Sequence, residues 1–484
     1  MNAWSVLPLL VPLITTLACL ALRDRPGAQR WASFTGAVLF LAVAGTLAVG
    51  TAKGVVYETR LGDWPEPFAI RLRIDALGAA LLAVSGVVLV AVLLVPGRGE
   101  SATASSPLLL PLVHGLMVGV GGAFSTADLF NLYVWFEVML ICALGLIALG
   151  RERRHLDAAL RYLVLNSLGA VLLLCAVGGI YGISGSLDFG AAATGLGGSE
   201  SASPAATALV ALALLALLIK SAAFPFGAWL PAAYPVLPTP ILALFAGLLT
   251  KVGAYAVLRL VAEIAPAAAA PLLEPLGWIA AATMLTGVLG AAYHQDLRRI
   301  LSFHVISQIG YILLAISLGT RAAIAAALVY TIHHILVKAN LFLISGLIRR
   351  SGGSFDLRHL GGLASRPALA FVFAIPAASL IGLPLTSGFW AKLTVVKLCF
   401  AEGRYVFGIV ALLVGGLTLY SMTKVWIEAF WKEPPEPVYP RRLPAAAWWS
   451  TYSLAAITLV LGIHPEPLLE FAALAARLGP LELP

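Results

Sequence analysis

The stretch "ALLIKSAAFPFGAWLPAAYPVLPTP", residues 216–240, joins an apolar run to a single lysine and five prolines. Residues 205–219 contain Thr207 as their only polar side chain, so Lys220 follows several turns of apolar helix. A charge at bilayer depth costs at least about 3 kcal/mol, and such a group usually faces protein or water and carries function. Proline removes a helical hydrogen bond and clashes with the preceding turn. The stretch therefore predicts a membrane helix that is interrupted directly after a buried lysine.

The composition of the whole chain is that of a polytopic α-helical membrane protein. Of 484 residues, 60% are hydrophobic and 11% are charged, whereas soluble domains carry roughly 25% charged residues. Apolar stretches long enough to cross a core of about 30 Å recur from end to end. The four cysteines fall inside these stretches without a CxxC pair or Cys/His cluster, so we expect no metal or cofactor. The net charge of +8 reflects loop topology and an anionic leaflet rather than nucleic acid.

Hydropathy predicts fourteen spans. They lie near residues 3–22, 31–52, 74–96, 107–126, 128–149, 161–183, 205–224, 240–262, 272–292, 300–319, 322–348, 367–397, 404–430 and 445–463. The division between the fourth and fifth rests only on Ser125, Thr126 and Asp128. No soluble domain is inserted, because the longest polar stretch is about residues 53–73.

The basic residues predict which side of the membrane each loop occupies. Odd-numbered loops hold seventeen Lys and Arg residues, among them Arg98, Arg151, Arg441 and Arg442, and even-numbered loops hold eight. Because cytoplasmic loops carry the excess of positive charge, the odd loops are predicted to be cytoplasmic and both termini to lie outside. This is the expected topology of a multi-pass protein of the cell (inner) membrane.

Five lysines remain inside the predicted spans, and acidic partners are few. The lysines are Lys220, Lys251, Lys338, Lys392 and Lys424. Glu137 lies mid-span in "NLYVWFEVMLI", whereas Glu428 is close to a helix end and lies four residues after Lys424, which favours a local structural pair there. Lysines, histidines and a glutamate at membrane depth are the residue types expected of a proton path.

A second interruption suggests an internal repeat. In "IPAASLIGLPLTSGFWAKL", residues 375–393, Pro376, Pro384 and Gly388 precede Lys392. Broken helices in corresponding halves of a transporter point to an ion site at the membrane midplane. The seventh and twelfth spans are five apart, which suits a five-helix unit (spans 4–8) repeated in inverted orientation as spans 9–13. The predicted organisation is therefore 1–106 (spans 1–3), 107–262 (first repeat), 272–430 (second repeat) and 431–484 (span 14 and tail).

Two histidine-containing stretches lie between these interruptions. "YTIHHILVKANLF", residues 330–342, places His334 and Lys338 on one helix face. "RRILSFHVISQIGY", residues 298–311, adds His304, although a lone membrane histidine serves as a structural hydrogen bonder about equally often. The chain contains no nucleotide-binding, serine-hydrolase or zinc-protease motif. We therefore expect neither ATP hydrolysis nor a redox centre.

These stretches, together with "DLFNLYVWFEVML" at residues 128–140, resemble the antiporter-like subunits shared by Mrp-type cation/proton antiporters and respiratory complex I, and above all the D-type subunit. The resemblance implies two inverted five-helix repeats with broken seventh and twelfth helices. It also implies a proton relay in which Glu137 pairs with Lys220 and Lys251 connects onward. The relay would continue through His334 and Lys338 to Lys392, where one complex I subunit type carries glutamate instead. His304 lies where complex I homologues often have a small hydroxyl residue.

The expected function is that of a proton-translocating subunit of a multisubunit sodium/proton antiporter, a secondary transporter rather than an enzyme. Its expected partners are Mrp-type A, B, C, E, F and G-like subunits, protons, sodium and the lipid bilayer. The alternative is a proton module of a complex I-like dehydrogenase, hydrogenase or inorganic-carbon uptake complex, where it would be part of a translocase. A self-sufficient solute transporter would need a roomy polar site, and five intramembrane lysines disfavour a mere scaffold.

Overall fold

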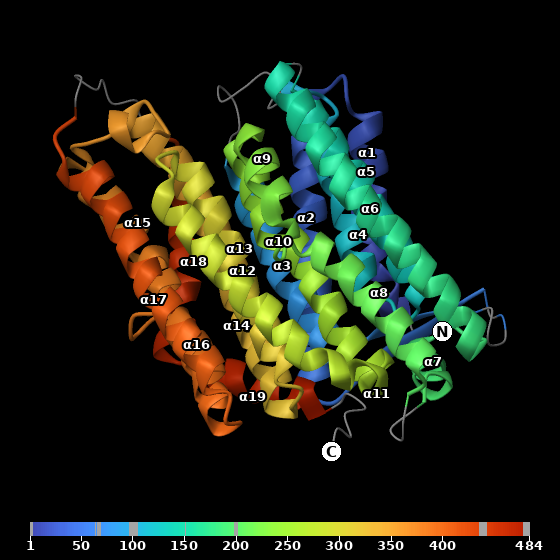
Figure 1. The fold of residues 1–484 in the computed structure, drawn as a ribbon. Coiled ribbons are helices and arrows are strands. Elements are labelled where there is room, and N and C mark those ends of the chain that lie inside the picture. Colours follow the sequence, from blue (N-terminus) through green and yellow to red (C-terminus); the bar gives the residue numbers. More distant parts are fainter. Residues whose placement is uncertain are drawn as a thin grey trace.

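The computed structural model describes residues 3–62, 64, 69–95, 105–150, 152–197, 202–434 and 443–477. Long helices run side by side and slant together through the molecule (Figure 1). Arg98, Arg151, Arg441 and Arg442 of the topology count, and the last residues of the predicted tail (478–484), lie outside the described residues.

The N-terminal part holds three long helices and one hairpin. Its elements are η1 (Ala3–Ser5), α1 (Leu7–Ala21), α2 (Pro26–Ala52), β1 (Tyr57–Leu61), β2 (Ile70–Ile74) and α3 (Ala76–Leu94). β1 and β2 pair antiparallel, with Tyr57 opposite Ile74. The chain is mostly helical, as predicted, but the hairpin was not predicted, because the short alternation in "YETRL" and "IRLRI" lies within a stretch taken as a polar loop. Asp75 then caps α3 by accepting a hydrogen bond from the Gly78 N–H at 2.9 Å.

The middle of the chain forms the second group of helices. It comprises α4 (Leu109–Ser125), α5 (Leu129–Ala148), α6 (Arg153–Ser184), α7 (Phe189–Gly195), α8 (Pro204–Lys220), η3 (Phe226–Ala228), α9 (Trp229–Ala233), η4 (Tyr234–Val236), α10 (Thr239–Arg259) and the π-helical turn η5 (Leu260–Ile264). The predicted division at residues 126–128 separates α4 from α5, because Asp128 is extended and caps α5 at the Asn131 N–H, 2.6 Å away.

The C-terminal part holds the remaining helices. It comprises α11 (Pro266–Ala269), η6 (Ala270–Leu272), α12 (Leu273–Tyr293), α13 (Leu297–Ser317), α14 (Arg321–Gly352), η7 (Leu357–His359), η8 (Leu363–Ser365), α15 (Pro367–Ile381), α16 (Ser387–Ala401), α17 (Tyr405–Trp426), the π-helical turn η9 (Ile427–Trp431), α18 (Ala445–Ile463) and α19 (Glu466–Arg477). Helix α19 packs against α14 and α3 and was not predicted.

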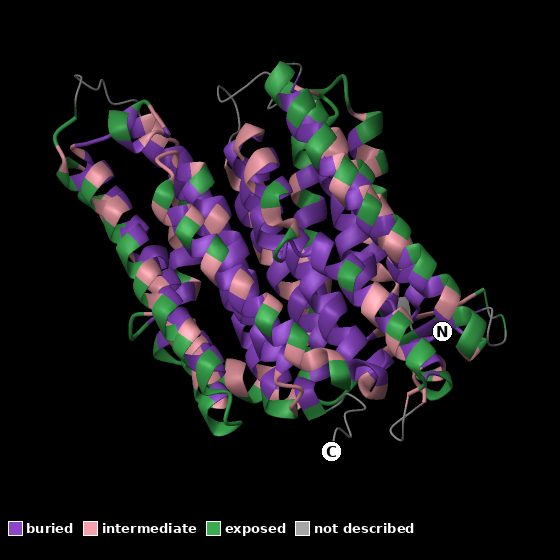
Figure 2. Cartoon of the chain, in the orientation of Figure 1, coloured by how far each residue is buried: buried purple, intermediate pink, exposed green. Residues whose placement is uncertain are grey.

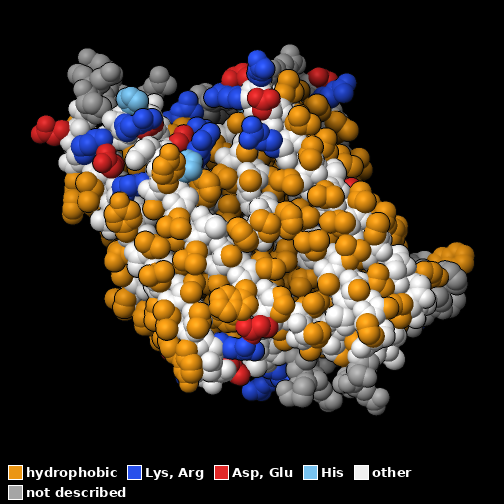
Figure 3. Space-filling model, in the orientation of Figure 1, with side chains coloured by type: hydrophobic (Ala, Val, Ile, Leu, Met, Phe, Trp, Pro, Cys, Tyr) orange, Lys and Arg blue, Asp and Glu red, His pale blue; other side chains and the backbone are white. Residues whose placement is uncertain are grey.

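The structure is that of a polytopic membrane protein. Ten helices among the described residues are long and apolar enough to cross a bilayer, and the shorter apolar helices α1, α4, α8 and α15 occupy the other predicted ranges. Hydrophobic side chains cover the middle of the visible surface and charged ones gather at its two ends (Figure 3). This is the distribution that a hydrocarbon core imposes.

Three helices form the interior of the molecule. The most apolar part of α10 is 100% buried, that of α13 94% and that of α14 89%, whereas α6, α17 and α18 reach only 39%. Figure 2 shows buried residues dominating the central helices and exposed residues on the flanking ones. Four of the predicted relay residues lie on these three central helices, so protein surrounds them rather than lipid.

Both predicted interruptions are present. Helix α8 ends at Lys220, and Ala222 adopts a left-handed backbone (φ 57°) before the short helices η3 and α9. Helix α15 ends at Ile381, and residues 382–386 form a turn before α16. Gly382 has φ 95° in this turn, a conformation that suits glycine. Pro376 lies inside α15, so the second interruption begins later than that proline.

The same backbone bridge occurs in both groups of helices. Asp128, before α5, bridges to Asp188, before α7, and Asp296, before α13, bridges in the same way to Asp356. Helices α7 and α11 both lie at the lower end in Figure 1, so α12 starts there and delivers α13 to the opposite end. The two bridges thus lie at opposite ends of the bundle.

Candidate functional site

Lys220 and Glu137 are brought together from α8 and α5, but not as a contact ion pair. Lys220 is 5% exposed, and its Nζ lies 4.9 Å from the ring centroid of Phe136. Glu137 is close enough to interact electrostatically with Lys220. Within the described part of the chain, no ion pair of 4 Å or less includes Glu137, and its buried Oε1 has no hydrogen-bond partner. The Phe136 ring thus lies beside the buried amine of Lys220, and Glu137, a half-buried acid on the next residue, interacts with that amine through space.

Lys251, His334 and Lys338 form the centre of the site. Lys251 lies in the middle of α10, is fully buried and donates a hydrogen bond to the Ala246 carbonyl. Helix α14 packs on α10 and carries His334, whose two ring nitrogens are buried without a partner among the described residues. Lys338, one turn further, donates to the Leu301 carbonyl at 3.4 Å. These three groups interact electrostatically with one another.

The centre of the site contains bases without acids. In the described residues, neither Lys251 nor Lys338 has a carboxylate within ion-pair distance. Two positive charges side by side in a low-dielectric interior repel strongly. Such groups titrate as a coupled set rather than independently. The arrangement therefore favours one proton shared among several bases, which is what a transfer path requires.

His304 connects α13 to α17. Its Nε2 lies 3.0 Å from the Ser421 hydroxyl, and its Nδ1 is buried without a partner among the described residues. It interacts electrostatically with Lys338 and Lys392. His304 thus lies beside the central row and also holds two helices together.

Lys392 occupies the second interruption. It lies on α16, and its Nζ donates a 2.8 Å hydrogen bond to the carbonyl of Ile381, the last residue of α15. Its Nζ is also 5.2 Å from the Tyr311 ring centroid. A Cβ on Gly382 would come within 2.8 Å of the Lys392 Cδ. The interruption therefore does two things for Lys392: it frees a carbonyl to bind the amine, and it leaves space for the side chain.

His333 was missed by the sequence reasoning, which selected only the histidine that stacks on Lys338. Its Nδ1 lies 2.9 Å from the Ser387 hydroxyl at the start of α16, and its Nε2 is buried and unpartnered among the described residues. Ser379 on α15 lies 3.2 Å from Ser387 and accepts a hydrogen bond from the Gly388 N–H. His333 also interacts electrostatically with Lys392. The signal was the adjacent pair of histidines, because neighbouring residues of a helix point about 100° apart and the two rings therefore meet different helices.

Lys424 binds the end of α12 and is not part of the row of titratable residues. Its Nζ donates to the carbonyls of Ala292 and His294, both at 2.7 Å. Glu428 forms its ion pair with Lys432 at 2.7 Å, so the predicted Lys424–Glu428 pair was wrong. The structural role expected for Lys424 is nevertheless consistent with these two hydrogen bonds, because they satisfy free carbonyls at a helix end.

A buried ion network that the sequence reasoning also missed anchors the far end of α10. Arg259 pairs with Asp75 at 2.6 Å and with Glu263 at 2.7 Å, and Arg73 also pairs with Glu263. Burial alone would raise the pKa of Asp75, but the attraction of Arg259 outweighs it and holds that pKa at about 2. The network ties the hairpin and α3 to the helix that carries Lys251.

Comparisons of the sequence and of the structure with known proteins identify relatives of the same family. A model of the family described as "NADH:quinone oxidoreductase/Mrp antiporter, TM" matches residues 126–418. The D subunit of the Na(+)/H(+) antiporter of Alkalihalophilus pseudofirmus is 37% identical over 98% of this chain and 96% of the relative. The N subunit of the NADH-quinone oxidoreductase of Desulforudis audaxviator is 34% identical over 89% of this chain and 88% of the relative. A chain of the Mrp complex from Dietzia sp. DQ12-45-1b superposes with a TM-score of 0.91 and is 32% identical, covering 98% of this chain and 97% of that one.

Proposed function

Since the chain belongs to the NADH:quinone oxidoreductase/Mrp antiporter transmembrane family, we propose that it is the D-type, proton-translocating subunit of a multisubunit sodium/proton antiporter. It is a transporter subunit rather than an enzyme in its own right. Its partners would be the other subunits of such a complex, of Mrp types A, B, C, E, F and G, in the cell membrane.

The observation that carries the proposal is the row of buried and half-buried titratable side chains, each of which interacts electrostatically with another. The row contains Glu137 on α5, Lys220 on α8, Lys251 on α10, His304 on α13, His333, His334 and Lys338 on α14, and Lys392 on α16. At its centre, bases are buried without acids, although each buried charge is costly. A fold that needed only packing would place apolar residues there, so the row is best explained by proton transfer.

The proposed mechanism couples neighbouring bases by charge. When Lys220 holds a proton, Glu137 stabilises it. When that proton moves to Lys251, its charge displaces a proton already held by Lys338 towards Lys392, because the two lysines repel each other without a carboxylate between them. Protonation thus advances along the row towards Lys392. The interrupted helices place Lys220 at the end of α8, and they place the Lys392 amine beside the Ile381 carbonyl, to which it donates a hydrogen bond.

Fourteen membrane crossings and two inverted five-helix repeats, over residues 107–262 and 272–430, remain part of the proposal. The equivalent Asp128–Asp188 and Asp296–Asp356 bridges at opposite ends of the bundle support the inversion. The excess of basic residues in odd loops supports placing both termini outside the cytoplasm.

A complex I-like proton module is the second candidate, and the relative from the NADH-quinone oxidoreductase of Desulforudis audaxviator favours keeping it. In that case a redox complex, not sodium, would drive the protons. Lys392, a lysine where one complex I subunit type carries glutamate, does not by itself distinguish the two.

The test is to purify the chain from its native membrane under mild detergent and to identify the subunits that accompany it. The purified complex is then placed in vesicles, and proton movement is followed with a ΔpH-sensitive dye after addition of sodium or choline. Sodium-dependent proton movement without a redox substrate supports the antiporter. Co-purifying redox subunits and proton movement only on addition of a reductant would overturn it.

A further inference from the structure

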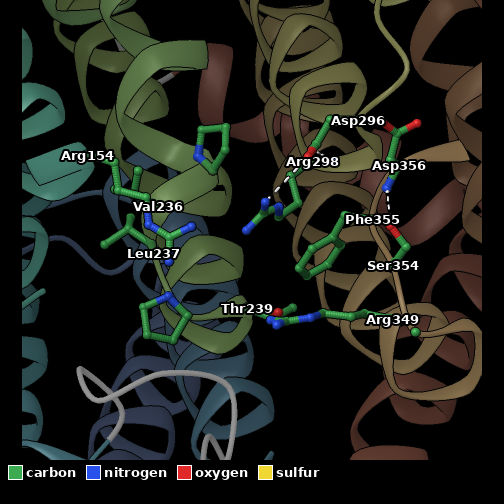
Figure 4. A pocket seen from close by; sticks show the side chains of 13 residues that line it. Arg154, Val236, Leu237, Thr239, Asp296, Arg298, Arg349, Ser354, Phe355 and Asp356 are labelled. Atoms are coloured by element: carbon green, nitrogen blue, oxygen red, sulfur yellow. Dashed lines mark hydrogen bonds and ion pairs between the residues drawn. The ribbon is translucent and has the colours of Figure 1, made fainter. Parts of the chain in front are cut away.

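A pocket of about 300 Å³ lies between the two halves of the molecule, at the end where α13 begins (Figure 4). Its walls come from Arg154 at the start of α6, residues 235–239 before and at the start of α10, and Asp296 and Arg298 at the start of α13. Arg349 near the end of α14 and residues 353–356 complete it. Every wall belongs to an odd-numbered loop or its flanks, the predicted cytoplasmic side.

The charged groups of the pocket leave one arginine uncompensated. Arg154 pairs with Glu152 at 2.7 Å, and Asp296 accepts a 3.3 Å hydrogen bond from Arg298. Asp356 pairs with Arg358 at 2.7 Å, and this hydrogen bond lowers the pKa of Asp356 to about 2. Arg349 has no carboxylate partner within the described ranges, and its guanidinium rests 5.0 Å from the Phe355 ring centroid.

The three arginines are also close to one another and have spare donors. Arg298 interacts electrostatically with both Arg349 and Arg154. Its Nε is buried and has no hydrogen-bond partner among the described residues, and its guanidinium lies 3.9 Å from the ring centroid of Phe355. Figure 4 shows the Arg349 side chain extended across the pocket towards Thr239. Thr239 begins α10, a 21-residue helix without a side-chain cap, so the positive end of a long helix faces the same space.

We propose that this pocket binds the phosphate group of an anionic phospholipid. Planar guanidinium groups match phosphate oxygens in geometry and charge, and a helix N-terminus adds backbone donors. Basic pockets between membrane helices on the cytoplasmic side are typical sites for such head groups.

Bound phosphate would connect the two helices at the centre of the row. Arg349 and Lys338 lie on α14, and Thr239 and Lys251 lie on α10. An anion held between Arg349 and the start of α10 fixes the ends of these helices relative to each other. The lipid would therefore stabilise the packing that places Lys251 beside Lys338, whichever complex contains the chain.

The experiment measures thermal unfolding of the purified complex in nanodiscs of phosphatidylcholine, with or without one-fifth phosphatidylglycerol. We expect phosphatidylglycerol to raise the Tm of the wild type by several degrees. Arg349→Gln should abolish this rise, Arg349→Lys should retain part of it, and Arg299→Gln should retain all of it. Arg299 is the matched control because it is exposed, adjacent to the pocket and absent from its lining. Native mass spectrometry then counts phosphatidylglycerol molecules retained by each variant, with one fewer expected for Arg349→Gln.

The sources of phosphate are separated by adding inorganic phosphate to the phosphatidylcholine nanodiscs. A rise in Tm with phosphatidylglycerol but not with phosphate assigns the site to the lipid. A rise with phosphate alone that Arg349→Gln removes assigns the pocket to a free anion and overturns the lipid. Equal loss of the lipid effect in Arg349→Gln and Arg299→Gln would overturn the site altogether, because it would reflect surface charge in general. An Arg349→Gln variant that retains as many phosphatidylglycerol molecules as the wild type would also overturn the site.

Discussion

Replacing Lys392 with Met tests whether the row extends to the second interruption. Met keeps most of the apolar stem but removes the amine that donates to the Ile381 carbonyl at 2.8 Å. Loss of that hydrogen bond, with a carbonyl left free at the end of α15, should cost about 1–3 kcal/mol of stability. Loss of a proton carrier in a serial path should lower proton movement by about 100-fold or more. The transport defect should thus greatly exceed the stability defect.

Sodium-driven ΔpH in vesicles containing equal amounts of the complex is the assay. Lys392→Glu should retain partial transport, because a titratable group survives and its protonated form can still donate to Ile381. Lys424→Ala is the control for a half-buried lysine off the row, since the hydrogen bonds of Lys424 go to carbonyls at the end of α12. Near-normal transport in Lys392→Met together with an inactive Lys424→Ala would refute this order of residues.

Three further changes follow from the same structure. Glu137→Gln removes the charge that acts on Lys220 without changing side-chain shape, so transport should fall by at least about 10-fold. The subunit composition of the complex purified by gel filtration should stay the same. Unchanged transport would exclude an interaction between Glu137 and Lys220. Gly382→Ala adds a Cβ at φ 95° within 2.8 Å of the Lys392 Cδ. It should lower the stability of the protein by about 1–2 kcal/mol and also lower transport. Unchanged stability and transport would show that the turn tolerates a side chain. Asp75→Asn concerns pH: because the folded pKa of Asp75 is about 2, below its unfolded value of about 3.9, its stabilising contribution is present above pH 4 and lost as pH falls towards 2. Unfolding temperatures between pH 7 and 3 should therefore decline more steeply for the wild type than for Asp75→Asn, and parallel curves would contradict this.

Residues whose signal is local could be predicted from the sequence. Lys220 and Lys392 stand out because each follows or lies within apolar helix, and proline or glycine beside them marks the interruption. Helix positions followed from hydropathy because every backbone group in a bilayer must be paired within the span. The equal spacing of the two interruptions then suggested the repeat.

Residues whose role depends on a distant partner could not be predicted. His333 gains its role from Ser387, which only the fold brings to 2.9 Å. Lys424 was expected to pair with Glu428 because the two are one turn apart, but the carbonyls at the end of α12 are nearer to its amine. In the same way, Glu137 and Lys220 lie close enough to interact, yet the Phe136 ring beside Lys220 is a detail that no spacing rule contains.

The most direct test of the central claim, that protons pass along the buried row, is transport by the complex with Lys251→Met. Lys251 lies in the middle of α10, fully buried and between the two halves of the row. Methionine fills nearly the same volume and cannot carry a proton. If the account is right, the variant assembles with all its subunits and shows no sodium-driven ΔpH. Wild-type ΔpH from a fully assembled Lys251→Met complex would contradict it.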